Sequence, residues 1–94
     1  MKNEITLETI IVRNGSIPST DIDGEIGLMN IKTGKYYALN TIGSEIWRIL
    51  EKPTSLNYLV TLKTSEYDID KDTCIIEIKK FVEKLVGEGI VIVK

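Results

Sequence analysis

The chain has 94 residues, of which 43% are hydrophobic, and its 12 basic and 14 acidic side chains give a formal net charge of −2. This length supports a single domain over residues 1–94, and the apolar content is typical of a folded protein. The charges are intermixed and form no basic tract, which argues against nucleic acid or an anionic membrane as a partner. The longest apolar run, residues 90–93, is too short to span a membrane.

Histidine is absent and Cys74 is the only cysteine. Without histidine, the chain lacks the usual base of serine and cysteine hydrolases and the commonest transition-metal ligand. A lone cysteine allows no internal disulfide, and no export signal follows Met1, so we expect a cytoplasmic protein in which Cys74 is a small buried apolar residue. We therefore predict that the chain is not an enzyme and needs no cofactor.

The first half of the chain predicts three strands. Alternation and β-branched residues indicate a strand over residues 5–13, followed by a Gly-, Pro- and Asp-containing loop over residues 14–24. Residues 25–31 and 35–39 are predicted as the second and third strands. They should pair antiparallel through a tight turn, because Gly34 can adopt positive φ at little cost.

Three helices should follow the strands. Asn40 or Thr41 can cap the first helix, and Pro53 ends it because a proline ring interrupts the hydrogen-bond ladder. Thr54 or Ser55 can cap the second helix.

Asp70 can cap a third helix. That helix should run to about Val86 and end in a left-handed turn at Gly87. A short strand over residues 90–93 closes the chain. The predicted fold class is α+β and winged-helix-like, with a three-stranded antiparallel sheet followed by three helices (βββααα) and a short C-terminal strand.

The third helix has two apolar sides at about 100° per residue. One side carries Ile78, Phe81, Val82 and Leu85. The adjacent side carries Ile75, Ile76, Lys79 and Val86, with Asp72 and Glu83 at its margin. The first side suffices to attach the helix to a sheet. The second side either widens that core contact, the commoner role of apolar stripes, or lines a ligand groove.

Tyr36 and Tyr37 are adjacent in a predicted strand, so their side chains should point to opposite faces. One should join Leu39 toward the helices, and the other should point outward. A structural and a functional role for this pair both stay open.

The run Asp68-Ile-Asp70-Lys-Asp72 imitates the start of a calcium-binding EF-hand loop. However, Thr73 and Lys79 stand where that loop needs glycine and a bidentate glutamate. We therefore predict no metal site here and interpret the aspartates as helix-capping residues.

Several motifs resemble the PqqD-like family over about residues 8–93. The most specific part is the run Tyr36-Tyr37-Ala38-Leu39-Asn40, followed by Gly43 and Ile46-Trp47. The other matching residues are Asp23-Gly24-Glu25, Leu28, Thr33-Gly34-Lys35, Leu50, Pro53, Leu59, Tyr67-Asp68, Phe81, Leu85 and Gly89-Ile90-Val91. The family comprises recognition elements for ribosomally synthesised and post-translationally modified peptides. Its members bind the leader segment of a precursor peptide and present the precursor to modifying enzymes.

The resemblance implies that a leader binds by β-augmentation, pairing antiparallel with the third strand in a groove against the third helix. From the strand, the implied peptide-binding residues are Lys35, Tyr36, Tyr37, Ala38 and Leu39. From the helix, they are Ile75, Ile76, Lys79, Val82, Glu83 and Val86. Lasso-peptide leaders commonly carry a Tyr-x-x-Pro motif, whose two rings would fill apolar pockets here. Lys79 and Glu83 would pair with leader charges.

Within the family, the chain is most similar to the leader-binding subunit of lasso-peptide systems. That subunit works with a separate transglutaminase-like leader peptidase. An alternative is a PqqD-like chaperone that serves a radical SAM peptide-modifying enzyme. A winged-helix nucleic-acid-binding protein is less favoured, because lysines and glutamates balance along the third helix and leave no cationic face for phosphates.

Overall fold

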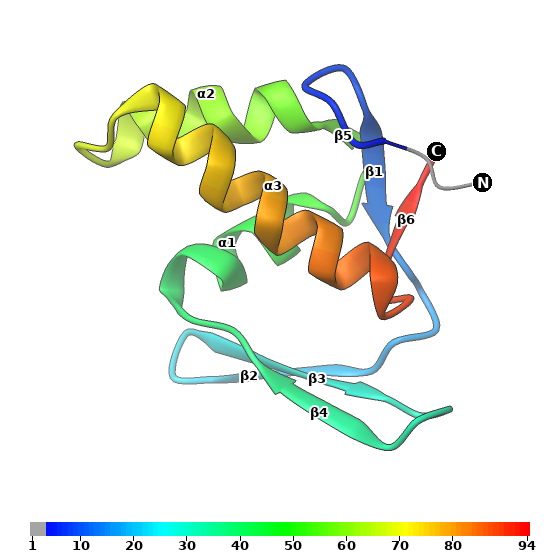
Figure 1. Ribbon diagram of the computed structural model, residues 1–94. Coiled ribbons are helices and arrows are strands. Elements are labelled where there is room, and N and C mark those ends of the chain that lie inside the picture. The colour runs from blue at the N-terminus through cyan, green and yellow to red at the C-terminus, as the bar shows by residue number, and fades with distance from the viewer. Residues whose placement is uncertain (1–3) are drawn as a thin grey trace.

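The computed structural model describes residues 4–94, in which two small sheets flank three helices (Figure 1). In chain order the elements are β1 (Ile10–Arg13), β2 (Ser19–Ile22), β3 (Glu25–Asn30), β4 (Lys35–Ala38), α1 (Thr41–Ile49), β5 (Thr54–Ser55), α2 (Leu56–Glu66), α3 (Lys71–Gly87) and β6 (Val91–Val93). The α+β class is confirmed, with a three-stranded antiparallel sheet, three helices and a C-terminal strand.

The first sheet has the strand order β2-β3-β4, and both pairings are antiparallel. Asp23 (φ 54°) and Gly24 (φ 89°) form the two-residue turn between β2 and β3. Positive φ at both positions matches the twist of the flanking strands, which explains the Asp-Gly pair. Gly34 (φ 74°) supplies the predicted turn before β4.

The strand composition of this sheet differs from the prediction. β2 lies inside the expected loop over residues 14–24, and the expected strand over residues 5–13 shortens to β1 and belongs to the other sheet. All four residues of β2 are exposed, so the strand has no buried–exposed alternation from which it could be predicted.

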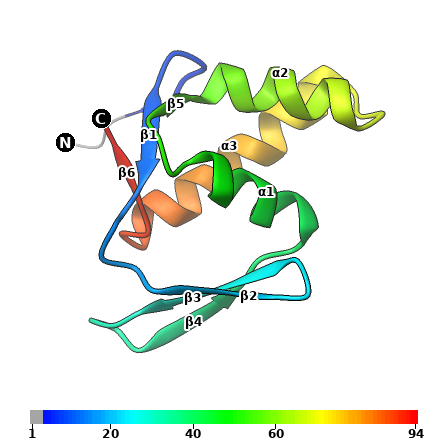
Figure 2. The same cartoon turned by 180° about the vertical axis from the view of Figure 1, so that it is seen from behind.

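The second sheet has the order β5-β1-β6, again with antiparallel pairing. It stands at the side of the helices, whereas the β2-β3-β4 sheet lies beneath them in both views (Figures 1 and 2). Residues from both ends of the chain therefore meet in one sheet.

The predicted helix caps are confirmed at Asn40, Ser55 and Asp70, whose side chains accept hydrogen bonds from backbone N–H groups at 2.8, 3.1 and 3.2 Å. The third helix ends within one residue of the predicted Val86, but the predicted left-handed turn at Gly87 is wrong. Gly87 is still helical, and the residue with positive φ is Gly89 (φ 74°).

The end of α3 forms a Schellman motif. The N–H of Ile90 donates to the carbonyl of Leu85 (2.9 Å), and that of Gly89 donates to Val86 (3.1 Å). The residue that reverses the chain must adopt a left-handed conformation, which glycine does at little cost, and here that residue is Gly89.

The core lies between the helices and the inner faces of the two sheets. Its fully buried members include Ile11, Trp47, Leu59, Val82 and Ile90. The Arg13 guanidinium lies 5.0 Å from the centroid of the Trp47 ring, a cation–π contact between β1 and α1.

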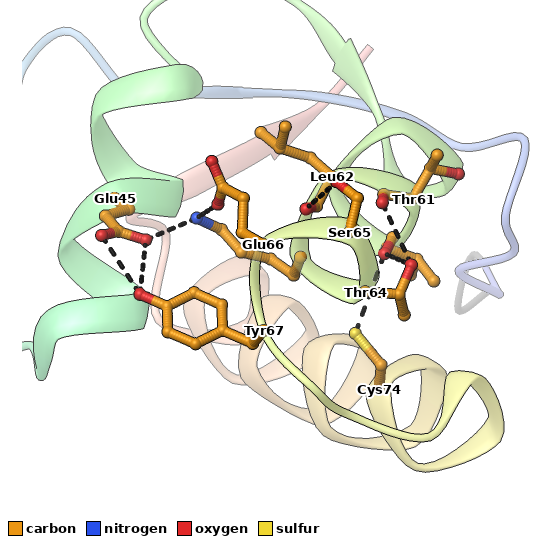
Figure 3. Close-up of polar contacts among 10 residues, drawn as sticks. Glu45, Thr61, Leu62, Thr64, Ser65, Glu66, Tyr67 and Cys74 are labelled. Atoms are coloured by element: carbon orange, nitrogen blue, oxygen red, sulfur yellow. Dashed lines mark hydrogen bonds and ion pairs between the residues drawn. The ribbon is translucent and has the colours of Figure 1, made fainter.

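A buried lysine links α1 to α2 (Figure 3). Lys63 is 2% exposed, and its Nζ donates to Glu45 (2.6 Å) and Glu66 (2.9 Å). The Tyr67 hydroxyl donates to Glu45 (3.1 Å). Burial alone would lower the pKa of Lys63, but the two carboxylates outweigh it and raise that pKa, while the bond from Lys63 lowers the pKa of Glu45.

Cys74 is buried on α3, as expected, with its Sγ 3.9 Å from the Val60 carbonyl oxygen, and burial raises the pKa of its thiol. A buried thiol with a raised pKa is a poor nucleophile. Within residues 4–94, there is no cluster of three or more metal-ligating side chains, and no helix is both long and apolar enough to cross a bilayer.

Candidate peptide-binding site

The outer edge of β4 carries unpaired backbone groups. Within residues 4–94, β4 pairs only with β3. The Leu39 N–H donates to the Ile26 carbonyl (2.8 Å), and bonding residues alternate along an antiparallel pair. The backbones of Lys35 and Tyr37 therefore face β3, whereas the N–H and C=O groups of Tyr36 and Ala38 point away from the sheet.

A buried hydroxyl fixes the end of this edge to α1. Ser44 is fully buried, and its Oγ accepts from the Ile26 N–H (2.8 Å) and donates to the Leu39 carbonyl (3.2 Å). The hydroxyl thus replaces one direct bond of the β3–β4 ladder. Because both backbone groups would otherwise be buried without a partner, Ser44 holds β4 in register with its neighbours.

A cavity of about 400 Å³ lies between β4 and the C-terminal half of α3. It is lined by Tyr36, Tyr37, Ala38, Leu39, Asn40, Phe81, Lys84 and Leu85. Its size is within the range of small ligand pockets, large enough for a side chain or two of a bound peptide. Its walls are mostly aromatic and aliphatic, and Lys84 supplies the charge.

A polar network joins β4 to the end of α3 beside this cavity. The Tyr37 hydroxyl donates to Glu88 Oε1 (2.6 Å), and Lys35 Nζ lies 3.8 Å from the same oxygen. From β3, Asn30 Nδ2 donates to the Glu88 carbonyl (3.0 Å). The bond from Tyr37 lowers the pKa of Glu88 and raises that of the tyrosine. Three contacts at one residue thus set the distance between the strand and the helix.

The two tyrosines point to opposite faces of β4, as expected. Tyr37 is half-buried on the helix side with Leu39, whereas Tyr36 is 55% exposed. The Tyr36 ring lies across β3 above Gly27, where an added Cβ would come within 2.1 Å of the tyrosine hydroxyl oxygen. The missing side chain at Gly27 therefore makes room for this ring.

The residues predicted from α3 are distributed differently from the expected groove wall. Val82 is fully buried in the core. Glu83 and Val86 line a second, larger cavity of about 900 Å³ together with Ile5 and residues of β6. Ile75, Ile76 and Lys79 line neither of these two cavities.

Helix geometry explains this distribution. At about 100° per residue, Phe81 and Lys84 lie on one flank of the buried stripe, and Lys79, Glu83 and Val86 lie on the opposite flank. The flank with Phe81 and Lys84 faces β4. The structure therefore brings four of the five predicted strand residues together in one cavity, with Lys35 joined to them through Glu88, and does not place the predicted helix residues there.

Sequence reasoning missed Asn40, Phe81, Lys84 and Leu85 as lining residues of this cavity. Phe81 and Leu85 carried an available signal, because both belong to the motifs of the family resemblance, yet their periodicity indicated only a core role. Phe81 belongs to both the core and the site, since it packs against the core and its half-exposed ring lines the cavity. Lys84 carried no signal beyond its charge.

Comparison with known proteins identifies the family. Residues 25–91 match the protein-family model described as Coenzyme PQQ synthesis protein D (PqqD). This match covers most of the chain and includes β3, β4 and all three helices, so the chain belongs to the PqqD family. A search of curated proteins found no match.

Among solved structures, the chain is similar to TbiB1, determined in complex with the TbiA(beta) leader peptide. The two share 28% sequence identity with a TM-score of 0.77, and the similarity covers 85% of this chain and 93% of TbiB1. The likeness thus extends over nearly the whole fold.

Proposed function

We propose that this protein binds the leader segment of a ribosomally synthesised precursor peptide by β-augmentation at the outer edge of β4. The observation that carries the proposal is the juxtaposition of this edge with the cavity against α3. Membership of the PqqD family and the similarity to TbiB1, which was determined with a leader peptide bound, support it.

The backbone of β4 supplies the main-chain part of recognition. Tyr36 and Ala38 each offer one N–H and one C=O to a strand that aligns beside them. Such bonds give affinity with little sequence preference, because every peptide carries the same backbone groups. The protein therefore recognises an extended conformation first and side chains second.

The cavity supplies the sequence preference. A leader on β4 directs alternate side chains toward Phe81 and Leu85 on α3. An aromatic or proline ring suits these walls, as in the Tyr-x-x-Pro motif expected of lasso-peptide leaders. Lys84 at the same wall favours an acidic or polar leader residue close to that anchor.

The role proposed for the chain is recognition without catalysis. The bound leader is delivered to a separate modifying enzyme in the cytoplasm, for which we propose a transglutaminase-like leader peptidase of a lasso-peptide system. A radical SAM peptide-modifying enzyme is the alternative, because stand-alone relatives serve both kinds of enzyme.

Two assignments of the helix residues can be separated by titration calorimetry with a synthetic leader peptide. The cavity between β4 and α3 supports a contact on the flank of α3 that faces β4, so Lys84→Ala should weaken binding several-fold. The sequence-based assignment to Ile76 and Lys79 stays a prediction, and Ile76→Ala and Lys79→Ala are the matched variants for it. All three side chains lie outside the fully buried core, so folding should be preserved.

The calorimetry has two informative outcomes besides the expected one. Loss of binding in Ile76→Ala or Lys79→Ala with Lys84→Ala unaffected would move the leader to the opposite flank of the helix. Absence of leader binding to the folded wild-type protein would refute the proposed function.

A further inference from the structure

A second open strand edge lies on the other sheet. Within residues 4–94, β6 pairs only with β1, and it lies on the outer side of β1 in both views (Figures 1 and 2). The Lys94 N–H donates to the Ile10 carbonyl (2.8 Å). Bonding residues alternate along the pair, so the N–H and C=O groups of Val91 and Val93 point away from β1. β6 therefore offers the same kind of backbone edge as β4.

The larger cavity, of about 900 Å³, borders this edge. Ile5, Val86 and Val93 give it aliphatic walls, and the charged residues that line it within residues 4–94 are Glu4 and Glu83. Neither carboxylate forms an ion pair with any residue in the part of the chain that the structure describes. The surface thus combines outward backbone groups, an apolar hollow and two carboxylates that form no ion pair within residues 4–94.

We propose that β6 and this cavity form a docking site for an extended segment of a partner protein, one that carries aliphatic side chains and a lysine or arginine. The outward groups of Val91 and Val93 pair with the backbone of that segment, as in β-augmentation. Its aliphatic side chains enter the cavity, and its cation lies near Glu4 and Glu83, where charge complementarity selects it over an acidic segment.

This site is separate from the one proposed for the leader. β4 and β6 belong to different sheets, and Lys84 and Glu83 lie on opposite flanks of α3. A leader on β4 and a partner segment on β6 can therefore be bound together. Such an arrangement places a bound peptide and a second protein on one small scaffold.

The test is an amide NMR titration of the full chain with two synthetic peptides that differ in one charge. The probes are Ac-Val-Thr-Lys-Thr-Val-NH₂ and Ac-Val-Thr-Glu-Thr-Val-NH₂, each added to millimolar concentration. The lysine peptide should shift the amides of Gly87, Gly89, Val91 and Val93 in a saturable manner. The affinity of the glutamate peptide should be about fivefold lower, since its carboxylate meets like charge in the cavity.

Two variants locate the interaction. Val93→Pro removes one outward donor and should weaken the lysine peptide about fivefold, and Glu83→Lys should weaken it comparably. Neither change removes a bond of the β1–β6 ladder, so the fold is retained. Ala38→Pro, at the other sheet edge, is the matched control and should leave this titration unchanged.

Several results would overturn the docking site. These are the absence of saturable shifts at β6, equal affinity for the two peptides, or shifts confined to Tyr36 and Ala38. Shifts at Val91 and Val93 that depend on protein concentration without peptide would assign the edge to a second copy of this chain instead. Leader binding is measured separately, by calorimetry with a synthetic leader peptide, so failure here leaves the proposed function intact, and the reverse also holds.

Discussion

Ala38→Pro tests whether β4 receives the leader, because it removes a single outward donor from the edge. The Ala38 N–H makes no bond to β3, since the bonded residue of that ladder is the next one, Leu39. Proline is tolerated on an edge strand when its missing N–H faces solvent. It also restricts the preceding Tyr37 to extended backbone, which that residue already adopts within β4.

The magnitude follows from the number of backbone groups at the edge. Tyr36 and Ala38 together offer two outward N–H donors, and the variant removes one of them. Loss of a net hydrogen bond costs about 1 kcal/mol, and a leader carbonyl left without a partner in a covered groove adds about 1 kcal/mol or more. A total of about 2 kcal/mol corresponds to about 30-fold in Kd.

The assay is isothermal titration of the folded variant with a synthetic leader, with circular dichroism and a thermal melt to establish that the sheet is intact. Ser19→Pro is the matched control on the opposite edge. The Met29 N–H donates to the Pro18 carbonyl (3.2 Å), so the backbone of Ser19 points outward from β2 in the same way. This control should bind leader as the wild type does.

Two outcomes would refute the reasoning. A folded Ala38→Pro variant that binds leader within twofold of the wild type shows that β4 is not the receiving edge. A loss in Ser19→Pro as large as in Ala38→Pro places the leader at β2 or shows that proline acts through the sheet as a whole.

Two further predictions concern the framework around the site. Ser44→Ala leaves the Ile26 N–H and the Leu39 carbonyl buried without the bridging hydroxyl, so we expect a loss of about 1–3 kcal/mol in the free energy of unfolding, measured by urea denaturation. Ser65→Ala, on the exposed side of α2, is the control and should change stability by less than about 0.5 kcal/mol. An equal response of the two variants would contradict the bridging role of Ser44. The shifted pKa values of Lys63 and Glu45 predict the pH range over which this ion pair contributes to the free energy of unfolding. The pKa of Glu45 is lowered, so its contribution is complete above the ordinary value of 4.5 and is lost as pH falls through the lowered value. The pKa of Lys63 is raised, so its contribution is complete below 10.5 and is lost as pH rises through the raised value. Unfolding free energies across pH should therefore decline less toward acid in Glu45→Gln than in the wild type, and parallel profiles would refute the assignment.

Much of the local structure follows from residues that are close together in the chain. Asn40, Ser55 and Asp70 start the three helices because their side chains satisfy free backbone N–H groups, a property of each residue and its next neighbours. The turn at Gly34 and the opposite orientations of Tyr36 and Tyr37 are equally local. The motif around β4 also indicated the family, and the family resemblance in turn indicated which strand contributes to the candidate site.

Long-range packing sets which flank of α3 faces β4, and the local sequence does not. An amphipathic helix has two flanks on either side of its buried stripe, and periodicity treats them alike. The path of the chain into the β2-β3-β4 sheet puts Phe81 and Lys84 beside β4 and leaves Glu83 and Val86 beside β6. The sequence did not predict β2 for a related reason. Its pairing with β3 comes from the hairpin, and none of its side chains is buried, so the strand leaves no pattern of alternating burial.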